Sequence, residues 1–212
     1  MIIDHRTYTL HPRKIPEYLE IFGEHGLPVQ KKHLGDPLGY YYTEVGPLNQ
    51  VVHLWAYEDL DDMERRRSAR NTDPAWTEYR LHTVGLVHTQ EDKLVRPAPF
   101  FTPVREPRGK LIDHRTYTLN VGRLNHWLGL FEEFALPIMR EYIGEPVGFY
   151  LTEVGHVNTV THLWAYESLA EMQCRRAART ADPAWGEYLA KQGDALLHLN
   201  TKLLRPAPFF TA

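Results

Sequence analysis

Residues 53–58 have the sequence His-Leu-Trp-Ala-Tyr-Glu, and the same six residues return unchanged at 162–167. The two copies lie 109 positions apart, and the same spacing relates many positions before and after them without a gap. This period is far longer than the roughly 20–50 residues of a solenoid repeat. The sequence therefore predicts two copies of one small domain, at 1–101 and 111–212, joined by a linker at 102–110.

The composition is that of an ordinary globular protein. Of the 212 residues, 43% are hydrophobic and 24% are charged, and the formal net charge is −3 with no basic tail. This balance argues against nucleic-acid binding. No apolar run approaches the roughly 20 residues of a membrane span, and the first residues lack the apolar region of a signal peptide. The single cysteine, Cys174, excludes a disulfide framework. We expect a cytoplasmic protein that binds neither nucleic acid nor membrane.

Each copy is expected to fold as strand, helix, strand, strand, broken helix, strand. In the first copy we predict strands at 3–10, 38–45, 51–57 and 93–96, an amphipathic helix at 15–22, and a second helix from 60 that restarts at 73. Leu27-Pro28 is expected to kink or end the first helix, because proline lacks the donor that a helix interior needs. Asp73 before Pro74 is typical of a helix start.

This order is the split βαβ arrangement of a ferredoxin-like unit (βαββαβ), so the fold class is α+β. In such a unit the helices cover one face of a four-stranded sheet. The opposite face then needs a partner. A second copy on the same chain supplies one, so two tandem repeats are expected to close face to face.

The chain resembles the NIPSNAP family, which belongs to the dimeric α+β barrel superfamily. The resemblance rests on Arg6–Leu10, Thr43–Asn49, His53–Tyr57 and Asp73–Trp76. Each recurs in the second copy, with His156-Val157 replacing Pro47-Leu48. It implies that the two sheets form a dimeric α+β barrel. It implies no particular reaction, because fold does not dictate function. Relatives in the superfamily include haem-dependent enzymes and cofactor-free monooxygenases, and none of their site residues carries over by motif.

The repeated histidine strand is the leading candidate for a site. Alternation places His53, Trp55 and Tyr57 on one strand face, and we expect the barrel to turn this face inward. Its aliphatic face is expected to pack under the helices. The counterparts in the second copy are His162, Trp164 and Tyr166. An imidazole there can act as general base, hydrogen-bond donor or metal ligand. The alternative is a core histidine held by a neighbouring polar group.

Further ligand-binding candidates are the repeated pairs Arg6 and Arg115, Tyr8 and Tyr117, and Glu44 and Glu153. On the first strand His5 and Arg6 lie on opposite faces, so only one of them joins the His53 face. Glu44 is expected to form an ion pair with Arg6 or with the helix arginines, or to polarise a site histidine, because a buried unpaired charge is costly.

Three hypotheses for function follow. The first is a protein that binds or transforms a small apolar or aromatic molecule between the two sheets. The second is a non-catalytic structural or interaction module. The third is a haem-binding oxygenase-type enzyme, which needs only one axial histidine. Catalysis and cofactor stay open, and no cluster of residues at zinc spacing predicts a metal site.

Two expectations concern assembly and asymmetry. The tails at 97–101 and 206–210, Pro-Ala-Pro-Phe-Phe, are expected to expose paired aromatics, which predicts a homodimer or higher homo-oligomer. Tyr40 and Tyr42 become Phe149 and Leu151 in the second copy, which predicts a more polar pocket in the first copy. This prediction holds if the strand face that carries these residues lines a cavity.

Overall fold

The computed structural model describes residues 1–106 and 108–210. The first repeat consists of β1 (Ile2–Leu10), α1 (Ile15–Ile21), a π-helical turn (Phe22–Gly26), α2 (Leu27–Leu34), β2 (Gly39–Val45), β3 (Gln50–Tyr57), α3 (Leu60–Asn71), α4 (Pro74–His82) and β4 (Val87–Pro97). The second consists of β5 (Leu111–Leu119), α5 (Leu124–Leu130), a π-helical turn (Phe131–Ala135), α6 (Leu136–Tyr142), β6 (Gly148–Val154), β7 (Thr159–Tyr166), α7 (Leu169–Ala181), α8 (Pro183–Gln192) and β8 (Leu196–Pro206).

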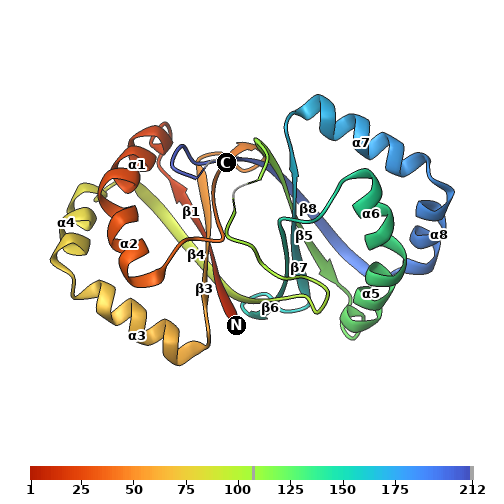
Figure 1. Ribbon diagram of the computed structural model, residues 1–212, viewed down its shortest axis with the longest axis horizontal. Helices are drawn as coiled ribbons and strands as arrows, with labels where there is room; N and C mark the ends of the chain where they lie inside the picture. The colour runs from red at the N-terminus through yellow and green to blue at the C-terminus, as the bar shows by residue number, and fades with distance from the viewer. Residues whose placement is uncertain (107, 211–212) are drawn as a thin grey trace.

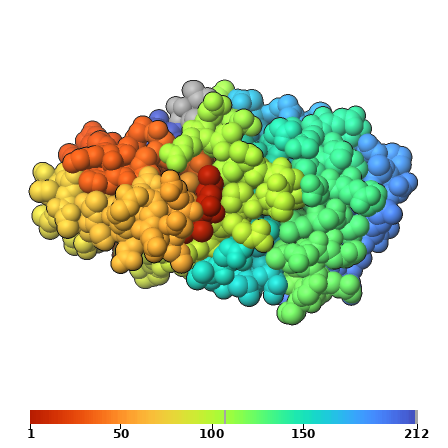
Figure 2. All heavy atoms as spheres, turned by 60° about the horizontal axis from the view of Figure 1, so that its bottom comes forward, coloured from red at the N-terminus to blue at the C-terminus, as the bar shows by residue number. Residues whose placement is uncertain are grey.

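The eight strands form one closed antiparallel barrel in the order β1-β3-β2-β8-β5-β7-β6-β4. Within each repeat the order is that of a ferredoxin-like unit, and the pairs β2–β8 and β4–β6 join the repeats. Figure 1 shows the strands at the centre, with α1–α4 outside one repeat and α5–α8 outside the other. Figure 2 shows that the two ends of the molecule are formed by different repeats. The predicted α+β barrel of two tandem repeats is confirmed.

The first helical segment continues past the predicted exit. A π-helical turn at Phe22–Gly26 leads directly into α2, and Pro28 lies in the first turn of that helix. Proline is tolerated there because its missing N–H would have had no partner within the helix. Of the two predicted alternatives, the exit at Leu27-Pro28 was wrong, because the chain continues as α2, and the helical irregularity lies at Phe22–Gly26, directly before these residues.

The broken second helix is confirmed. Asp59 caps α3 by accepting from the backbone N–H of Asp62, and Asp73 caps α4 by accepting from that of Ala75. The last strand begins at Val87 rather than at Lys93. Its early part is exposed, and it is held by backbone pairing along β1 rather than by an apolar pattern.

The predicted orientation of the repeated histidine strand was wrong. In the register of β1 and β3, His53 lies opposite Arg6 and Leu54 lies opposite His5. Arg6 and His53 line a pocket together with helix residues, whereas His5 lines a cavity inside the barrel. The histidine face therefore lies under the helices, and Val52, Leu54 and Ala56 point into the barrel. Facing sheets pack closely, and short aliphatic side chains fill that space.

The two aromatic tails are covered within the chain. The backbone N–H of Ala98 donates to the carbonyl of Phe149, and Phe100 packs edge-on against the same phenylalanine. The second tail is bound in the same way to the first repeat, where Phe209 contacts Phe22 and Tyr40. Each tail thus crosses to the other repeat, which removes the exposed aromatics from which we predicted a dimer. The dimer itself stays a prediction.

In the described part of the chain, no helix combines the length and the apolar character needed to cross a membrane.

Candidate functional site

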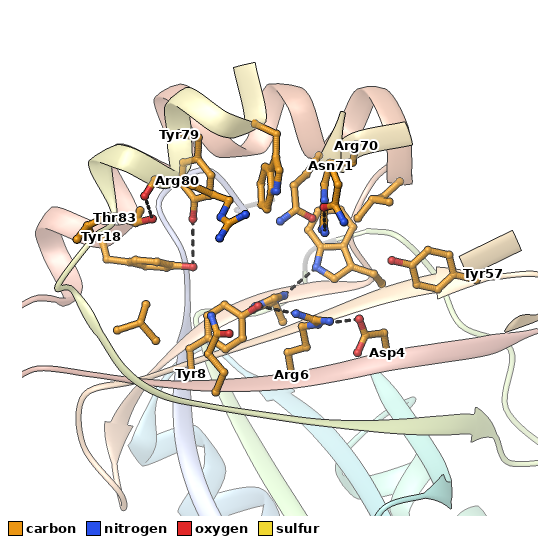
Figure 3. Close-up of a pocket in the computed structure, with 18 residues that line it drawn as sticks. Asp4, Arg6, Tyr8, Tyr18, Tyr57, Arg70, Asn71, Tyr79, Arg80 and Thr83 are labelled. Atoms are coloured by element: carbon orange, nitrogen blue, oxygen red, sulfur yellow. Dashed lines mark hydrogen bonds and ion pairs between the residues drawn. The ribbon is translucent and has the colours of Figure 1, made fainter. Parts of the chain in front are cut away.

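A cavity of about 330 Å³ lies between the sheet of the first repeat and its helices. Figure 3 shows β-strand side chains of Asp4, Arg6 and Tyr8 facing helix side chains such as Arg70 and Tyr79. Its counterpart in the second repeat has a volume of about 240 Å³. The pseudo-symmetric chain therefore holds two candidate sites, one in each repeat.

His53 forms the floor of the first pocket and is 2% exposed. The indole Nε1 of Trp55 donates to Nδ1 of His53 at 2.8 Å. Burial and the nearby Arg6 guanidinium lower the pKa of His53 to about 3, so the ring is neutral at physiological pH. A neutral imidazole that accepts at Nδ1 carries its proton at Nε2. His53 therefore presents an N–H donor, and it offers no lone pair to the pocket.

Aromatic rings hold this imidazole in place. Tyr40 stacks on it with ring centroids 5.0 Å apart, and Tyr8 meets it edge-on at 4.7 Å. The Nε2 atom is buried and has no hydrogen-bond partner among the described residues. A buried donor without a partner costs free energy, which an acceptor on a bound molecule would recover.

Arg6 organises the wall next to His53. Its Nε donates to Asp4 Oδ2 at 2.7 Å, and its terminal nitrogen donates to the Tyr8 hydroxyl at 2.7 Å. Burial alone would lower the pKa of Arg6, but Tyr8 and Asp4 more than offset this and raise it. Asp4 also accepts from Arg67 of α3, which fixes the strand to the helix above it. The wall is a rigid network of paired charges.

Five buried polar atoms of the residues that line the first pocket have no partner among the described residues. They are His53 Nε2, Arg70 Nε, the Tyr57 hydroxyl, Asp4 Oδ1 and Gln30 Oε1. Native interiors leave few polar groups unpaired, and each such group needs an explanation. Their concentration around one cavity is the strongest local sign of a ligand site.

The second pocket repeats the frame with the same chemistry. Trp164 Nε1 donates to His162 Nδ1 at 2.7 Å, and Arg115 donates to Asp113 and to Tyr117. Burial and Arg115 lower the pKa of His162 to about 3. Its Nε2 and the Nε of Arg179 are again buried without partners among the described residues.

The lining around this frame differs between the repeats. Gln30, Arg80 and Gln90 of the first pocket are replaced in the second by Met139, Leu189 and Leu199. The first pocket is therefore the more polar one. Tyr40 lies behind His53 rather than in the lining, and Tyr42 lies in a groove beside α1, so these two tyrosines are not the main cause of the difference.

The other predicted ligand-binding residues divide into two groups. Arg6, Tyr8, Trp55 and Tyr57 line the first pocket, and Arg115, Tyr117, Trp164 and Tyr166 line the second. Glu44 and Glu153 line neither. The predicted pairing of Glu44 with Arg6 or with the helix arginines was wrong, because it pairs with Arg205 of the other repeat.

Glu153 pairs with Arg96 in the same way. Both carboxylates lie near the ends of their strands, where the two repeats meet, and their side chains are about half exposed. They join the repeats and do not polarise the histidines.

The geometry of His53 does not fit haem or metal ligation. A ligating Nε2 needs its lone pair, which would place the proton on Nδ1. That proton would then face the indole N–H of Trp55, so two donors would meet at 2.8 Å. The same holds for His162 and Trp164. Ligation through these histidines would break the hydrogen bond that positions them.

Sequence reasoning did not assign several polar residues of the first pocket, among them Asp4, Arg70 and Gln30. Asp4 shares its strand face with Arg6, and both recur in the second copy, so alternation contained a signal for it. Arg70 was one of several helix arginines, and the sequence did not show that it would lie over Trp76, 4.3 Å from its ring centre. Gln30 becomes Met139 in the second copy and left no repeated signal.

The chain matches NIPSNAP over residues 3–102 and again over 112–211. It belongs to the NIPSNAP family. Both matches coincide with the two repeats that build the barrel, so this NIPSNAP chain carries the family domain in tandem.

Among its relatives, the NIPSNAP chain is 30% identical over 208 residues to a protein NipSnap homolog from Dictyostelium discoideum, covering 95% of this chain and 85% of that protein. It is 26% identical to protein NipSnap homolog 3A from Homo sapiens, covering 96% and 83%. A solved structure of an anthrone oxidase-like protein superposes with a TM-score of 0.60, covering 97% of this chain and 90% of that one. At 9% identity this likeness shows the barrel fold alone.

Proposed function

We propose that each repeat binds one small organic molecule between its sheet and its helices, through an oxygen that accepts hydrogen bonds from the buried histidine and arginine. The observation that carries this proposal is the pair of unpartnered donors in each pocket: His53 Nε2 with Arg70 Nε, and His162 Nε2 with Arg179 Nε. A carboxylate, phenolate or enolate oxygen matches a neutral N–H beside a guanidinium.

The shape of the pockets supports an aromatic or apolar body for this ligand. Each cavity is walled by rings, including Trp55, Tyr57 and Trp76 in the first pocket. Ligand sites of this kind combine an apolar lining with a few polar groups that fix orientation. The volumes of about 330 and 240 Å³ suit a molecule of one or two rings.

Any chemistry at these sites rests on stabilising negative charge. A histidine that donates from Nε2 cannot take a proton there, so the general-base role gives way to that of an electrophile. It would stabilise an enolate or phenolate that forms on a bound substrate. The frame of Trp55 and Arg6 keeps the donor in one orientation, which costs no reorganisation during reaction.

Titration with benzoate, monitored by calorimetry, tests the proposal. The wild-type chain is expected to bind benzoate, and His53→Phe and His162→Phe are each expected to weaken one site by about tenfold or more, because a hydrogen bond to a charged group is lost. Benzamide, which keeps the ring and a carbonyl but not the charge, should bind more weakly. The matched control is His198→Phe, which changes an exposed histidine on β8.

Unchanged affinity in both histidine variants would contradict the proposal. If a panel of aromatic carboxylates and phenols gave no binding at all, the non-catalytic interaction module would become the better hypothesis. The control keeps the argument specific, because it makes the same substitution outside the pockets.

A further inference from the structure

The barrel interior contains a third polar site that neither repeat forms alone. His5 and Lys93 are neighbours across β1 and β4, and His114 and Lys202 are neighbours across β5 and β8. All four line one cavity of about 450 Å³. This cavity lies on the opposite face of the sheet from the two pockets described above, because His5 and Arg6 alternate along β1.

The two imidazoles of this cavity lie against each other. His5 Nε2 and His114 Nε2 are 3.1 Å apart, and the two side chains are only 3% and 4% exposed. One ring donates and the other accepts, so the proton of one ring holds the pair together. Burial and the two lysines lower the pKa of both histidines well below the usual value. The pair is therefore neutral.

The two lysines bring positive charge into the cavity, and their ammonium groups donate hydrogen bonds to neutral side chains. Lys93 Nζ donates to the Thr161 hydroxyl at 2.7 Å, and Lys202 Nζ donates to the Gln50 side-chain oxygen at 2.9 Å. Both acceptors are neutral. In residues 1–106 and 108–210, no carboxylate lies within 4.0 Å of either ammonium group. Burial lowers the pKa of each lysine to about 8, so both are largely charged at pH 7.

Hydroxyl, amide and carboxylate groups complete the lining. Thr7, Thr116, Asn200 and Thr201 line the same cavity. The exposed carboxylates Glu91 and Asp92 line it as well, and Asp92 pairs with Arg6 on the other face of the sheet. Each ammonium group has three donors and spends one on its neutral partner, so donors are in excess over acceptors. The cavity therefore favours a ligand that brings negative charge and several acceptor oxygens.

The β2–β3 hairpin approaches Lys202 closely, and the β6–β7 hairpin approaches Lys93. Gly46 has a φ of +110°, and a Cβ atom there would lie 2.9 Å from Cβ of Lys202. Gly155 holds the matching position over Lys93, with a φ of +116°. Both glycines bring a hairpin close to a lysine stem in a conformation that other residues rarely adopt. Pro47 and His156 of these hairpins line the cavity as well.

We propose that this central cavity is a binding site for a phosphate group, either free phosphate or the phosphate of a small ester, held between Lys93 and Lys202. A tetrahedral dianion offers four acceptor oxygens to ammonium groups that approach from both repeats. It would neutralise the charges of the two lysines, which repel each other inside the barrel. The site lies on the pseudo-twofold axis, so each chain holds one.

Calorimetric titration with inorganic phosphate at pH 7, at constant ionic strength set with sodium chloride, tests this site. One phosphate per chain is expected. Lys93→Met and Lys202→Met are each expected to weaken binding by about tenfold or more, since each removes charge-assisted hydrogen bonds. Lys110→Met is the matched control, because that lysine is 77% exposed and lies outside the barrel. The stoichiometry separates this site from the two repeat pockets, which would bind two ligands per chain.

Thermal unfolding gives a second measurement with opposite signs. Without phosphate, each methionine variant should melt at a higher temperature than the wild type, because like charges no longer share a cavity. With phosphate, the wild type should gain stability and the variants should not. Glutamine variants at the same two positions keep a polar side chain if the methionine variants fail to fold.

Long-range ¹H–¹⁵N spectra of the wild type provide a test that needs no variant. Phosphate should shift the ring nitrogens of His5 and His114. Unshifted rings at tens of millimolar phosphate, or equal affinity in the wild type and both lysine variants, would overturn the proposal. If sulfate bound as tightly as phosphate, the cavity would be an anion site without a preference for phosphate, which would overturn its assignment to a phosphate group.

Discussion

In the first repeat Trp55 donates to His53 across 2.8 Å, and in the second repeat Trp164 donates to His162 across 2.7 Å. The frame that aims the histidine is thus the same in both pockets. The surroundings are not, because Gln30 and Arg80 of the first pocket are Met139 and Leu189 in the second. The part that stays the same is the part that the proposed binding of an oxygen uses, whereas the lining around it has diverged.

The unpartnered atoms sharpen this comparison. The first pocket has acceptors, Asp4 Oδ1 and Gln30 Oε1, that find no partner within residues 1–106 and 108–210, in addition to its donors. In the second pocket Asp113 Oδ1 is satisfied by the Thr201 hydroxyl at 2.9 Å, and methionine replaces Gln30. The first pocket therefore suits a ligand with both donors and acceptors. The second suits a more apolar ligand with one acceptor oxygen.

The largest effect is expected from separating the repeats. Residues 1–103 alone lose the β2–β8 and β4–β6 pairings and expose the inner face of their sheet. We expect this fragment to dimerise, aggregate or remain partly unfolded, as measured by light scattering and circular dichroism. A stable folded monomer of the fragment would contradict the interdependence of the repeats.

The next effect compares the two buried aspartates. Arg6→Met removes one of the two arginines on Asp4 and should lower the free energy of unfolding by about 3–5 kcal/mol, because a buried charge loses a partner. Arg115→Met should cost about 1 kcal/mol less, since Asp113 keeps both Arg176 and Thr201. Urea unfolding of both variants measures the difference.

Arg123→Met serves as the control, because that arginine is about half exposed at the surface and pairs loosely with Asp194. Equal losses for Arg6→Met and Arg115→Met would mean that the Thr201 hydroxyl contributes nothing to the second site.

A smaller effect is expected from acid. His53 and His162 have a pKa of about 3 in the folded chain against 6.5 in the unfolded chain. The unfolded state therefore takes up protons first as the pH falls below 6.5, and stability decreases towards pH 3. Each histidine contributes at most about 1.4 kcal/mol per pH unit. Urea unfolding between pH 7 and 5 should show a shallower slope in His53→Gln and, to the same extent, in His162→Gln.

Unequal changes in slope would show that the two histidines differ in environment as well as in neighbours. The two repeats would then differ also around the Trp–His hydrogen bond that orients each histidine. His198→Gln, which makes the same substitution at an exposed histidine outside the pockets, is the matched control.

The sequence was sufficient for the repeats and the strand order, because both are visible in residue identity and in alternation along the chain, and the resemblance to the NIPSNAP family implied the barrel. It did not reveal which strand face lies inside the barrel. The face of His53 is polar and aromatic and that of Leu54 is aliphatic, and either can be buried on either side of a sheet. The outcome depends on Arg6 and Asp4 of β1, and on arginines of α3 that reach down to them.

The position of His5 and His114 inside the barrel depended on the same unknown, namely which strand face points inward. His5 and Arg6 were known to lie on opposite faces, and placing Arg6 with His53 sends His5 to the interior. His5 lies opposite Lys93 because β4 begins at Val87, several residues before the stretch that the sequence predicted as a strand. The first part of β4 is polar and exposed, so it shows no alternation of apolar and polar residues from which a strand could be predicted.

The smallest expected effect comes from exchanging one residue between the pockets. Gln30→Met gives the first pocket the residue of the second and removes a buried oxygen that has no partner, so it should stabilise the chain by about 1 kcal/mol. Met139→Gln makes the reverse change and should destabilise by a similar amount. Thermal and urea unfolding of the two variants and of the double exchange measure these differences.

The exchange also tests whether Gln30 is unpaired for the sake of a ligand. Salicylate differs from benzoate by a hydroxyl beside its carboxylate. If the Gln30 oxygen accepts a hydrogen bond from a bound molecule, Gln30→Met should stabilise the chain and should lower its affinity for salicylate relative to benzoate. Met139→Gln should shift the second pocket towards salicylate. A gain in stability with no change in the salicylate-to-benzoate ratio would show that this glutamine is a cost to the fold that no ligand recovers. The two pockets would then differ in packing alone.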